Sequence, residues 1–488
     1  MFRMDIVLFA VGFMFMLNVI SATRYEANWQ SIDSRPLPSW FDEAKIGIFL
    51  HWGVFSVPAT YESPWFWYWW KTKTPLFVKF MKDFYPPNFT YADFAPQFQA
   101  AFYNPDQWAD IFEAAGARYI VLVTKHHEGF TLWPSKHSWN WNAMDVGPNR
   151  DLLGDLATAV RKKKNMRFGV YHSLFEFYNP EFLNDQANHF KTQDFVWGKT
   201  MPELFELVNN YHPEVIWSDG HWMAPAEYWN STKFLAWLYN ESPVKDTVVV
   251  NDRWGIGTDC HHGGYWNCKD QYNPGKPLPH KWENAMTLDR KCWGIRREIM
   301  AGDIYTVLEI VTVLAETVSC GGNLLMNVPP TSDGRILPLF EERLREFGAW
   351  MKINGEAIYA SKPWHTQNDT ITKNVWYTTQ RTSNTTVVYA IVLSWPENNT
   401  LQLSAPVPMA TTEIQMLGYA GGNFKYTTYV NNTLSIVFPG IPFNCLPSTD
   451  AWVLKMTNLK NQAASPEFER VVTPQQLVPI NLGNPPRT

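Results

Sequence analysis

Side chains capable of acid–base chemistry and hydrogen bonding follow five short apolar runs of this sequence, one group at the end of each run. They are His51, the pair His126 and His127, Tyr171, Asp219 and Arg253. A single histidine at such a position is most often structural, but five ends of the same kind indicate an assembled site. An aspartate among histidines, a tyrosine and an arginine could act as a nucleophile or as a general base.

The runs that precede these residues have the composition of buried β-strands, and amphipathic helical patterns separate them. Strands are predicted at residues 47–51, 119–124, 167–172, 214–217, 247–251 and 323–327, and helices at 105–115, 152–164, 202–210, 305–318 and 337–353. Nearly continuous apolar strands that alternate with helices favour an α/β fold, here a TIM-like (β/α) barrel. The active site of such a barrel lies at the carboxyl ends of its strands, where the five groups stand.

The sequence is also rich in aromatic residues, with 25 Trp, 21 Tyr and 31 Phe among 488 residues. Any single Trp is more often a core residue, but Trp65, Trp67, Trp69 and Trp70 form a cluster, and flat aromatic faces suit the C–H faces of sugars. A barrel with many aromatic residues, an aspartate at a strand end and further carboxylates downstream indicates glycoside hydrolysis. A retaining glycosidase needs a nucleophile and an acid/base about 5–5.5 Å apart.

Six motifs, in the same order over residues 25–360, resemble those of the animal α-L-fucosidases, glycoside hydrolase family 29. They are Gly47-Ile-Phe-Leu-His-Trp-Gly-Val-Phe-Ser-Val-Pro58, Thr124-Lys-His-His-Glu-Gly-Phe-Thr131, Val215-Ile-Trp-Ser-Asp-Gly220, Val250-Asn-Asp-Arg-Trp254, Cys260-His-His-Gly-Gly-Tyr265 and Lys281-Trp-Glu283. The resemblance implies a retaining α-L-fucosidase that removes terminal α-linked L-fucose from glycoproteins or glycolipids, without a metal or another cofactor.

The resemblance also implies roles for individual residues. Asp219 corresponds to the nucleophile, and the substrate-binding residues would be His51, His126, His127, Tyr171, Trp217, Arg253 and Trp65. A neutral imidazole, with one donor and one acceptor, matches a sugar hydroxyl. Asp270 and Glu283 both match acid/base positions proposed for animal members. We favour Asp270 slightly, because the Cys-His-His-Gly-Gly-Tyr context of the family precedes it, but the Gly- and Pro-rich segment between Cys260 and Glu283 leaves the choice open.

Two departures from the family pattern concern the sugar site and the second candidate acid. Many relatives carry Ser-Glu-Trp where this chain has Ser63-Pro64-Trp65, so a sugar-binding carboxylate is absent unless Glu62 replaces it. Ala285 stands where relatives often have a cysteine. Loss of one hydroxyl contact would weaken sugar binding without removing the nucleophile.

Composition shifts divide the chain into a signal peptide (1–23), the catalytic barrel (24–360), a C-terminal all-β sandwich (361–457) and a tail expected to be disordered (458–488). The first segment has a charged start, an apolar run and small residues at its end, and no other apolar run is long enough for a membrane span. After residue 360, short Thr-, Val- and Tyr-rich runs separated by Asn, Gly and Pro are typical of a β-sandwich.

The net charge of −5 gives no reason to expect nucleic acid or an anionic membrane as a partner. The signal peptide and seven N-x-S/T sequons point to the secretory pathway, with a lysosomal or extracellular destination; the sequons are Asn88, Asn230, Asn240, Asn368, Asn384, Asn398 and Asn431. Five cysteines leave at least one unpaired within the chain, and Cys260 and Cys268 are near enough in sequence to bridge. An aromatic-rich surface is compatible with a homo-oligomer.

Two alternative interpretations compete with a fucosidase. The first is a metal-dependent barrel hydrolase that uses His51, His126, His127 and Asp219 as ligands. If His126 and His127 both remain in extended structure, their side chains point to opposite faces and both cannot easily bind one ion, which argues against this metal site. The second is a catalytically weakened fucose-binding protein, suggested by Pro64 and Ala285. Retention of Asp219 and of both candidate acids argues against it.

Overall fold

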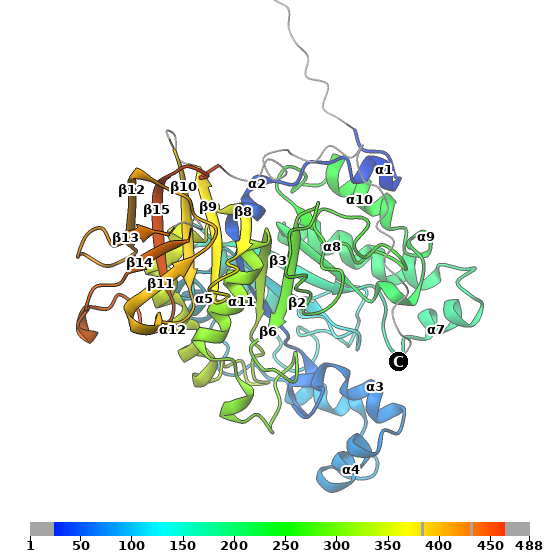
Figure 1. Ribbon diagram of the computed structural model, residues 1–488. Helices are drawn as coiled ribbons and strands as arrows, with labels where there is room; N and C mark the ends of the chain where they lie inside the picture. The colour runs from blue at the N-terminus through cyan, green and yellow to red at the C-terminus, as the bar shows by residue number, and fades with distance from the viewer. Residues whose placement is uncertain (1–23, 382–384, 430–432, 464–488) are drawn as a thin grey trace, which may run out of the picture.

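A computed structural model describes residues 24–381, 385–429 and 433–463 (Figure 1). The expected signal peptide and most of the expected tail lie outside these residues. The helices are α1 (Trp29–Ile32), α2 (Ser39–Ala44), α3 (Phe66–Lys71), α4 (Pro75–Phe84), α5 (Pro105–Ala114), α6 (Leu152–Arg161), α7 (Pro180–Ala187), α8 (Met201–Tyr211), α9 (Ala226–Trp229), α10 (Ser231–Asn240), α11 (Val307–Ser319) and α12 (Pro338–Asn354). Along the described chain, none of the helices is long and apolar enough to cross a bilayer.

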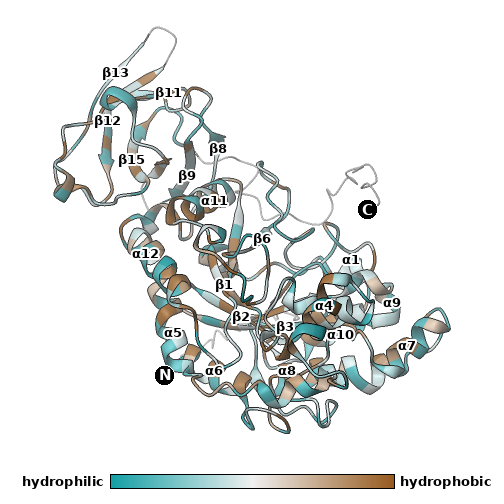
Figure 2. Ribbon diagram, turned by 90° about the horizontal axis from the view of Figure 1, so that it is seen from below, coloured by the Kyte–Doolittle hydropathy of each residue, from teal (hydrophilic) through white to brown (hydrophobic). Residues whose placement is uncertain are grey.

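Seven parallel strands form the central sheet, in the order β5-β4-β3-β2-β1-β7-β6. They are β1 (Ile46–Leu50), β2 (Tyr119–Lys125), β3 (Arg167–Ser173), β4 (Val215–Asp219), β5 (Val249–Val250), β6 (Trp282–Thr287) and β7 (Gly322–Asn327). Figure 2 shows brown, apolar stretches of α5, α11 and α12 beside the strands and teal stretches on their outer sides. The predicted TIM-like barrel is therefore confirmed, although β6 was not predicted as a strand.

Residues 264–271 fill the gap between the two edge strands and close the barrel. The backbone N–H groups of Gly264 and Tyr265 donate to the Val250 carbonyl of β5, each at 3.1 Å. On the other side, Trp266 N–H donates to Lys281 O at 2.9 Å and Gln271 N–H donates to Ala285 O at 3.0 Å, beside and within β6. This segment therefore runs parallel to β6 as an irregular eighth wall of the barrel.

Alternating residues of the strands fill the barrel interior. Phe49, Tyr171, Trp217 and Tyr265 point inward and are at most 2% exposed, and they share a core with Phe41 of α2. Because side chains two residues apart point to the same face of a strand, Asp219 continues the inward row of Trp217. The packed interior leaves the carboxyl end of the strands as the open end of the barrel.

The C-terminal region consists of two antiparallel sheets. One contains β12 (Pro408–Met416), β15 (Trp452–Leu459), β10 (Thr386–Val392), β9 (Val375–Arg381) and β8 (Lys362–Asn368), and the other contains β11 (Thr400–Leu403), β14 (Leu434–Val437) and β13 (Lys425–Thr428). Side chains of both sheets share one apolar core that includes Trp364, Leu401 and Ile436. The predicted C-terminal all-β fold is confirmed. It abuts the barrel at α11, which packs against β8 and β9, and at α12, where Trp350 Nε1 donates to Ala451 O at 3.2 Å.

Candidate active site

Asp219 lies at the end of β4, and only 8% of it is exposed. Tyr171 Oη donates to one carboxylate oxygen at 2.8 Å, and Arg253 Nη1 donates to the other at 3.1 Å. The chain then turns at Gly220, where φ is +79° and a Cβ atom would lie 2.5 Å from the Phe175 ring. Only glycine fits this turn. The carboxylate is therefore held by two donors in a fixed orientation.

The Arg253 guanidinium joins two carboxylates. Nη1 reaches Asp219, and Nη2 donates to Asp270 Oδ1 at 2.7 Å. Burial opposes the charge of Arg253, but the carboxylates of Asp270 and Asp219 raise its pKa above the usual range. The guanidinium also lies over the Trp217 ring, 4.6 Å from its centroid. One rigid fork thus limits how far apart the two carboxylates can be.

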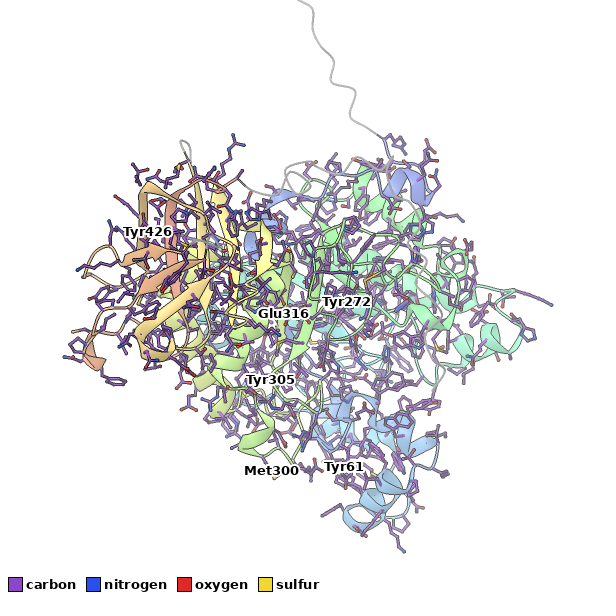
Figure 3. The ribbon with its side chains drawn as sticks, viewed as in Figure 1. Tyr61, Tyr272, Met300, Tyr305, Glu316 and Tyr426 are labelled. Carbon is purple, nitrogen blue, oxygen red and sulfur yellow. A yellow bond between two sulfur atoms is a disulfide. The ribbon has the colours of Figure 1, made fainter. Side chains whose placement is uncertain are left out.

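Asp270 is the second-last residue of the closing segment 264–271 and has a half-exposed side chain, at 55%. Asp252, just after β5, anchors this segment because its carboxylate accepts backbone N–H groups from Cys260, Asn267 and Cys268 at 2.8–3.0 Å. Cys260 and Cys268 form a disulfide, one of the pairings that their spacing allowed. After Asp270 the chain runs past α11, where Gly275 faces Glu316 of that helix. Figure 3 labels Glu316 close to Tyr272, which lies on the same stretch of chain as Gly275.

Glu283 lies deep in the barrel and has no exposed surface. Its carboxylate accepts hydrogen bonds from Tyr119 Oη at 2.6 Å, Trp217 Nε1 at 3.0 Å and Asn267 Nδ2 at 3.1 Å. Burial raises its pKa, while these three donors oppose that rise. Glu283 precedes Thr287, at the end of β6, by four residues, which at 3.3 Å per residue corresponds to about 13 Å along the strand. The structure therefore places the two candidate acids at different depths of the barrel.

Two of the predicted histidines have defined tautomers. Asn327 donates through Nδ2 to Trp293 O at 2.6 Å, so its Oδ1 accepts from His51 Nδ1 at 2.7 Å. Ser173 Oγ donates to Phe175 O at 2.6 Å, so it accepts from His127 Nδ1, also at 2.6 Å. In both rings Nε2 is left as the acceptor.

Burial keeps the site histidines uncharged, since it lowers the pKa of His51 to about 3 and that of His126 to about 4, and holds the pKa of His127 well below its usual value. His126 and His127 lie side by side, with ring centroids 4.1 Å apart. The expectation that their side chains point to opposite faces required both residues to be extended, and this condition is not met, because β2 ends at Lys125 and the chain turns, with Gly129 N–H donating to His126 O at 3.0 Å.

The two predicted tryptophans occupy different parts of the site. Trp217 is only 2% exposed and stacks on Tyr171 with centroids 5.6 Å apart, while its Nε1 is engaged by Glu283. It therefore supports Tyr171 and Arg253 from below. Trp65 lies at the rim, 5.2 Å from the His127 ring and nearly parallel to Trp222 at 6.4 Å.

Sequence reasoning missed two aromatic residues beside the site. Trp222, 41% exposed, faces His127 at 5.6 Å, and Trp293 faces His51 at 5.2 Å. Both follow strands that end at the open face, β4 and β6, so the strand-end rule could have identified Trp222 directly and Trp293 once β6 was recognised.

The structure also shows where the residues that depart from the family pattern lie, at positions 62–64 and 285. Glu62 is exposed and accepts from Trp69 Nε1 at 2.9 Å, so no contact joins it to the histidines. Pro64 is buried against Gly294, and Ala285 packs inside the barrel.

Among the described residues, no group of three His, Cys, Asp or Glu side chains has the arrangement of a metal site.

Comparison with known proteins identifies the family. The model described as α-L-fucosidase matches residues 13–356, and that for the α-L-fucosidase C-terminal domain matches residues 367–457. The tissue α-L-fucosidase of Homo sapiens is 56% identical over 438 residues, covering 90% of this chain and 92% of that protein. An α-L-fucosidase of Branchiostoma floridae is 56% identical over 451 residues, covering 91% and 99%.

Solved structures agree with the sequence comparison. A Thermotoga maritima α-fucosidase in complex with a mechanism-based inhibitor superimposes with a TM-score of 0.76 and 30% identity, covering 89% of this chain and 100% of that chain. The same enzyme in complex with fucose gives a TM-score of 0.74 and 31% identity, covering 89% and 100%. The chain therefore belongs to the α-L-fucosidase family, glycoside hydrolase family 29, and is an enzyme that hydrolyses O-glycosyl bonds.

Proposed function

We propose that this α-L-fucosidase acts with retention of configuration, with Asp219 as nucleophile and Asp270 as acid and base. The observation that carries the proposal is the Arg253 guanidinium, which donates to both carboxylates at 3.1 and 2.7 Å. One guanidinium that binds both carboxylates suits the short distance between the two carboxyl groups that a retaining mechanism requires. Glu283 is less suitable, because three barrel donors engage its oxygens well below the open end.

In the first step Asp219 attacks the anomeric carbon, the glycosidic C–O bond breaks, and Asp270 transfers a proton to the leaving oxygen. In the second step Asp270 takes a proton from water, which attacks the same carbon and releases Asp219. Tyr171 and Arg253 hold Asp219 in place, and burial with two donors suits an anionic nucleophile. The half-exposed Asp270 can exchange protons with solvent between the steps.

The sugar would lie among the neutral histidines. His51 and His127 each have an unprotonated Nε2 that can accept a hydrogen bond from a sugar hydroxyl. The Nε2 of His127 lies 3.7 Å from Asp219 Oδ2, so its partner would be a hydroxyl beside the nucleophile. Trp65 and Trp222 supply apolar surface at the rim, which suits the methyl group and C–H faces of a 6-deoxy sugar. The Thermotoga maritima relative, whose structure is described as a complex with fucose, supports this substrate.

The nucleophile is tested with an aryl α-L-fucoside and the Asp219→Ala variant. We expect the rate to fall by at least about a thousandfold and azide to restore part of it as a fucosyl azide, because a small anion can occupy the space of the lost carboxylate. Asp246→Ala, at an exposed aspartate after α10, is the matched control and should keep full activity. An Asp219→Ala enzyme as active as the wild type would contradict the assignment.

The stereochemistry needs a separate measurement. NMR of the first product formed from the aryl fucoside should show the α-anomer of L-fucose before mutarotation, as double displacement requires. First appearance of the β-anomer would replace the proposal with an inverting mechanism.

We also propose that the protein works in the secretory pathway, in lysosomes or outside the cell. The curated relatives of Homo sapiens are named tissue and plasma α-L-fucosidase. Two sequons, Asn88 and Asn398, are exposed on the folded surface and suit glycosylation. Cell fractionation after expression of the full chain, with activity measured in medium and lysosomes, tests this location. Activity confined to the cytosol would contradict it.

A further inference from the structure

A cavity of about 590 Å³, distinct from the Asp219 site, lies on the far side of α3 from Trp65. The residues that line it are Trp67, Trp70, Lys71, Lys73, Phe89, Thr90, Tyr91, Ala92, Glu128, Trp141, Glu176, Tyr178 and Asn179. Trp67, Trp70 and Lys71 are spaced three and four residues apart, so they share one face of the helix. Trp65 instead contacts His127. We call this cavity the aromatic cavity. It adjoins the Asp219 site at Glu128, whose Oε2 lies 3.6 Å from His126 Nδ1.

The walls of the aromatic cavity are flat rings. Trp67 stacks on Tyr91 with centroids 4.7 Å apart and an interplanar angle of 2°, and it meets the edge of Tyr178 at 4.8 Å. Trp141 lies beyond, 6.5 Å from Trp67. The volume lies in the range of small-molecule sites. Flat rings in such a space offer stacking surface to the C–H faces of a sugar ring.

Two buried polar atoms of the lining have no hydrogen-bond partner among the described residues. They are the Tyr178 hydroxyl and Glu128 Oε2, the second of which lies 3.6 Å from the equally unpaired His126 Nδ1, beyond hydrogen-bonding distance. Glu128 is 3% exposed, and burial raises its pKa to about 8, so below that pH it carries a proton and can donate. Buried polar groups without partners cost stability, and such groups on a cavity wall indicate a ligand that would satisfy them.

The charges around the cavity favour a neutral ligand. Glu176 is paired with Lys125 at 3.2 Å and Lys199 at 3.3 Å, and the acid of Glu128 is neutral. Lys71 lies 5.9 Å from the Tyr178 ring, at the exposed rim, and would disfavour a cationic ligand. Lys73 is also exposed at the rim. The inner polar groups are hydroxyl, amide and protonated carboxyl, which match the hydroxyls of an uncharged sugar.

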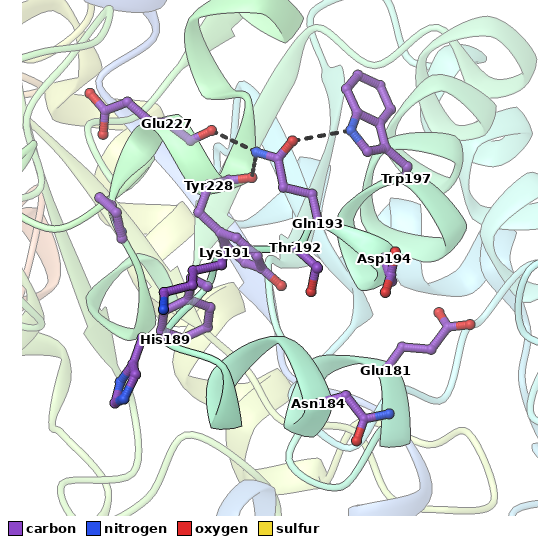
Figure 4. Close-up of a pocket in the computed structure, with 12 residues that line it drawn as sticks. Glu181, Asn184, His189, Lys191, Thr192, Gln193, Asp194, Trp197, Glu227 and Tyr228 are labelled. Atoms are coloured by element: carbon purple, nitrogen blue, oxygen red, sulfur yellow. Dashed lines mark hydrogen bonds between the residues drawn. The ribbon is translucent and has the colours of Figure 1, made fainter.

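A larger hollow of about 940 Å³ between α7 and α9 lacks these features (Figure 4). Its Gln193 side chain donates to the carbonyls of Glu227 and Tyr228 at 2.9 and 2.8 Å and accepts from Trp197 at 3.2 Å. None of the buried unpaired polar atoms found in the described residues belongs to its lining. It therefore gives no comparable indication of a ligand.

We propose that the aromatic cavity is a second carbohydrate-binding site, which takes a neutral pyranose ring and does not take part in bond cleavage. The ring would stack on the indoles of α3 and exchange hydrogen bonds with Tyr178 and Glu128. A fucosylated glycan contains several uncharged pyranoses, so the site would hold a part of the glycan remote from the cleaved bond, or another glycan chain.

Saturation-transfer NMR on the full chain tests the proposal, with methyl β-D-galactopyranoside and N-acetyl-D-glucosamine as probes at about 10 mM, the range of weak sugar binding. We expect signals from both probes on wild type and on Asp219→Ala. Weaker binding in Tyr178→Phe and Trp70→Ala, which leave the Asp219 site intact, assigns the signals to the aromatic cavity. Tyr178→Phe removes only the hydroxyl and should weaken binding by about fivefold. Trp70→Ala should weaken it by about tenfold.

Trp139→Ala is the matched control, since it removes an 80% exposed indole that is not part of the lining, and it should bind as wild type does. Thermal unfolding gives a second measurement: Tyr178→Phe should not lower the Tm, because the hydroxyl lacks a partner in the free protein. No transfer to either neutral sugar, equal binding by wild type, Tyr178→Phe and Trp70→Ala, or binding of N-acetylneuraminic acid alone would overturn the proposal.

Discussion

The choice between the two candidate acids predicts opposite behaviour for two conservative variants. In Asp270→Asn the amide oxygen can still accept from Arg253, so the fold and the position of Asp219 should be kept. Only the proton is lost. General acid catalysis contributes about 10²- to 10⁴-fold, which corresponds to about 3–5 kcal/mol of activation free energy. We expect that loss for a disaccharide with a poor leaving group and little loss for a 2,4-dinitrophenyl fucoside, which needs no proton.

Glu283→Gln should instead behave as a structural change. Three donors converge on the carboxylate, from Tyr119, Trp217 and Asn267, and the glutamine NH₂ group would face at least one of them. An unsatisfied buried donor costs about 1–3 kcal/mol, so the Tm should fall. Any rate loss should be the same for good and poor leaving groups, because the proton donor is intact.

The assay measures kcat/KM on both substrates beside the Tm of each variant. The reasoning is refuted if Glu283→Gln loses activity selectively on the poor leaving group while Asp270→Asn affects both substrates alike. The two variants serve as controls for each other, since each replaces a carboxylate by its amide.

Three further predictions concern the supports of the site and the surface. Burial lowers the pKa of His126 to about 4 from the ordinary histidine value of 6.5, so between these pH values the unfolded chain binds more protons than the folded one. The free energy of unfolding should therefore fall from pH 6.5 to pH 4, by about 3 kcal/mol for this group. Tm measured against pH should decline less steeply in His126→Gln than in the wild type. Asp252→Asn should lower kcat while Asp219 stays in place, because backbone N–H groups of the segment that carries Asp270 lose an acceptor. Proteolysis near residues 260–270 should become faster. Unchanged proteolysis and an unchanged kcat would contradict this prediction. Peptide mapping of the protein made in animal cells should find glycans at Asn88 and Asn398 but none at Asn230, which is 5% exposed, and a glycosylated Asn230 would show that this part of the fold is wrong.

Much of the active site could be predicted from the order of the residues. An apolar run that is buried on both faces must be a strand of a covered parallel sheet, and parallel strands end together. His51, Tyr171, Asp219 and Arg253 are therefore predicted from the sequence to lie on one face of the sheet. Such a prediction is possible because strand length, burial and direction are local properties of the chain.

The eighth wall and β6 could not be recognised in the same way. Their inward positions include Asn267 and Glu283, which interrupt the apolar pattern and resemble a loop. Such polar groups are stable inside a barrel only because Tyr119 and Trp217, far away in sequence, supply donors. No local pattern contains that information.

The same limit explains why the sequence left Asp270 and Glu283 equivalent. Both are carboxylates in a segment that resembles a loop over the site, and residue type alone cannot distinguish an acid at the open end from one buried in the interior. The difference is depth: Glu283 has no exposed surface, whereas the side chain of Asp270 is half-exposed, and depth depends on the register of the strands around the barrel. Register is set when the barrel closes, so Arg253 meets Asp270 and Trp217 meets Glu283 only in the folded chain.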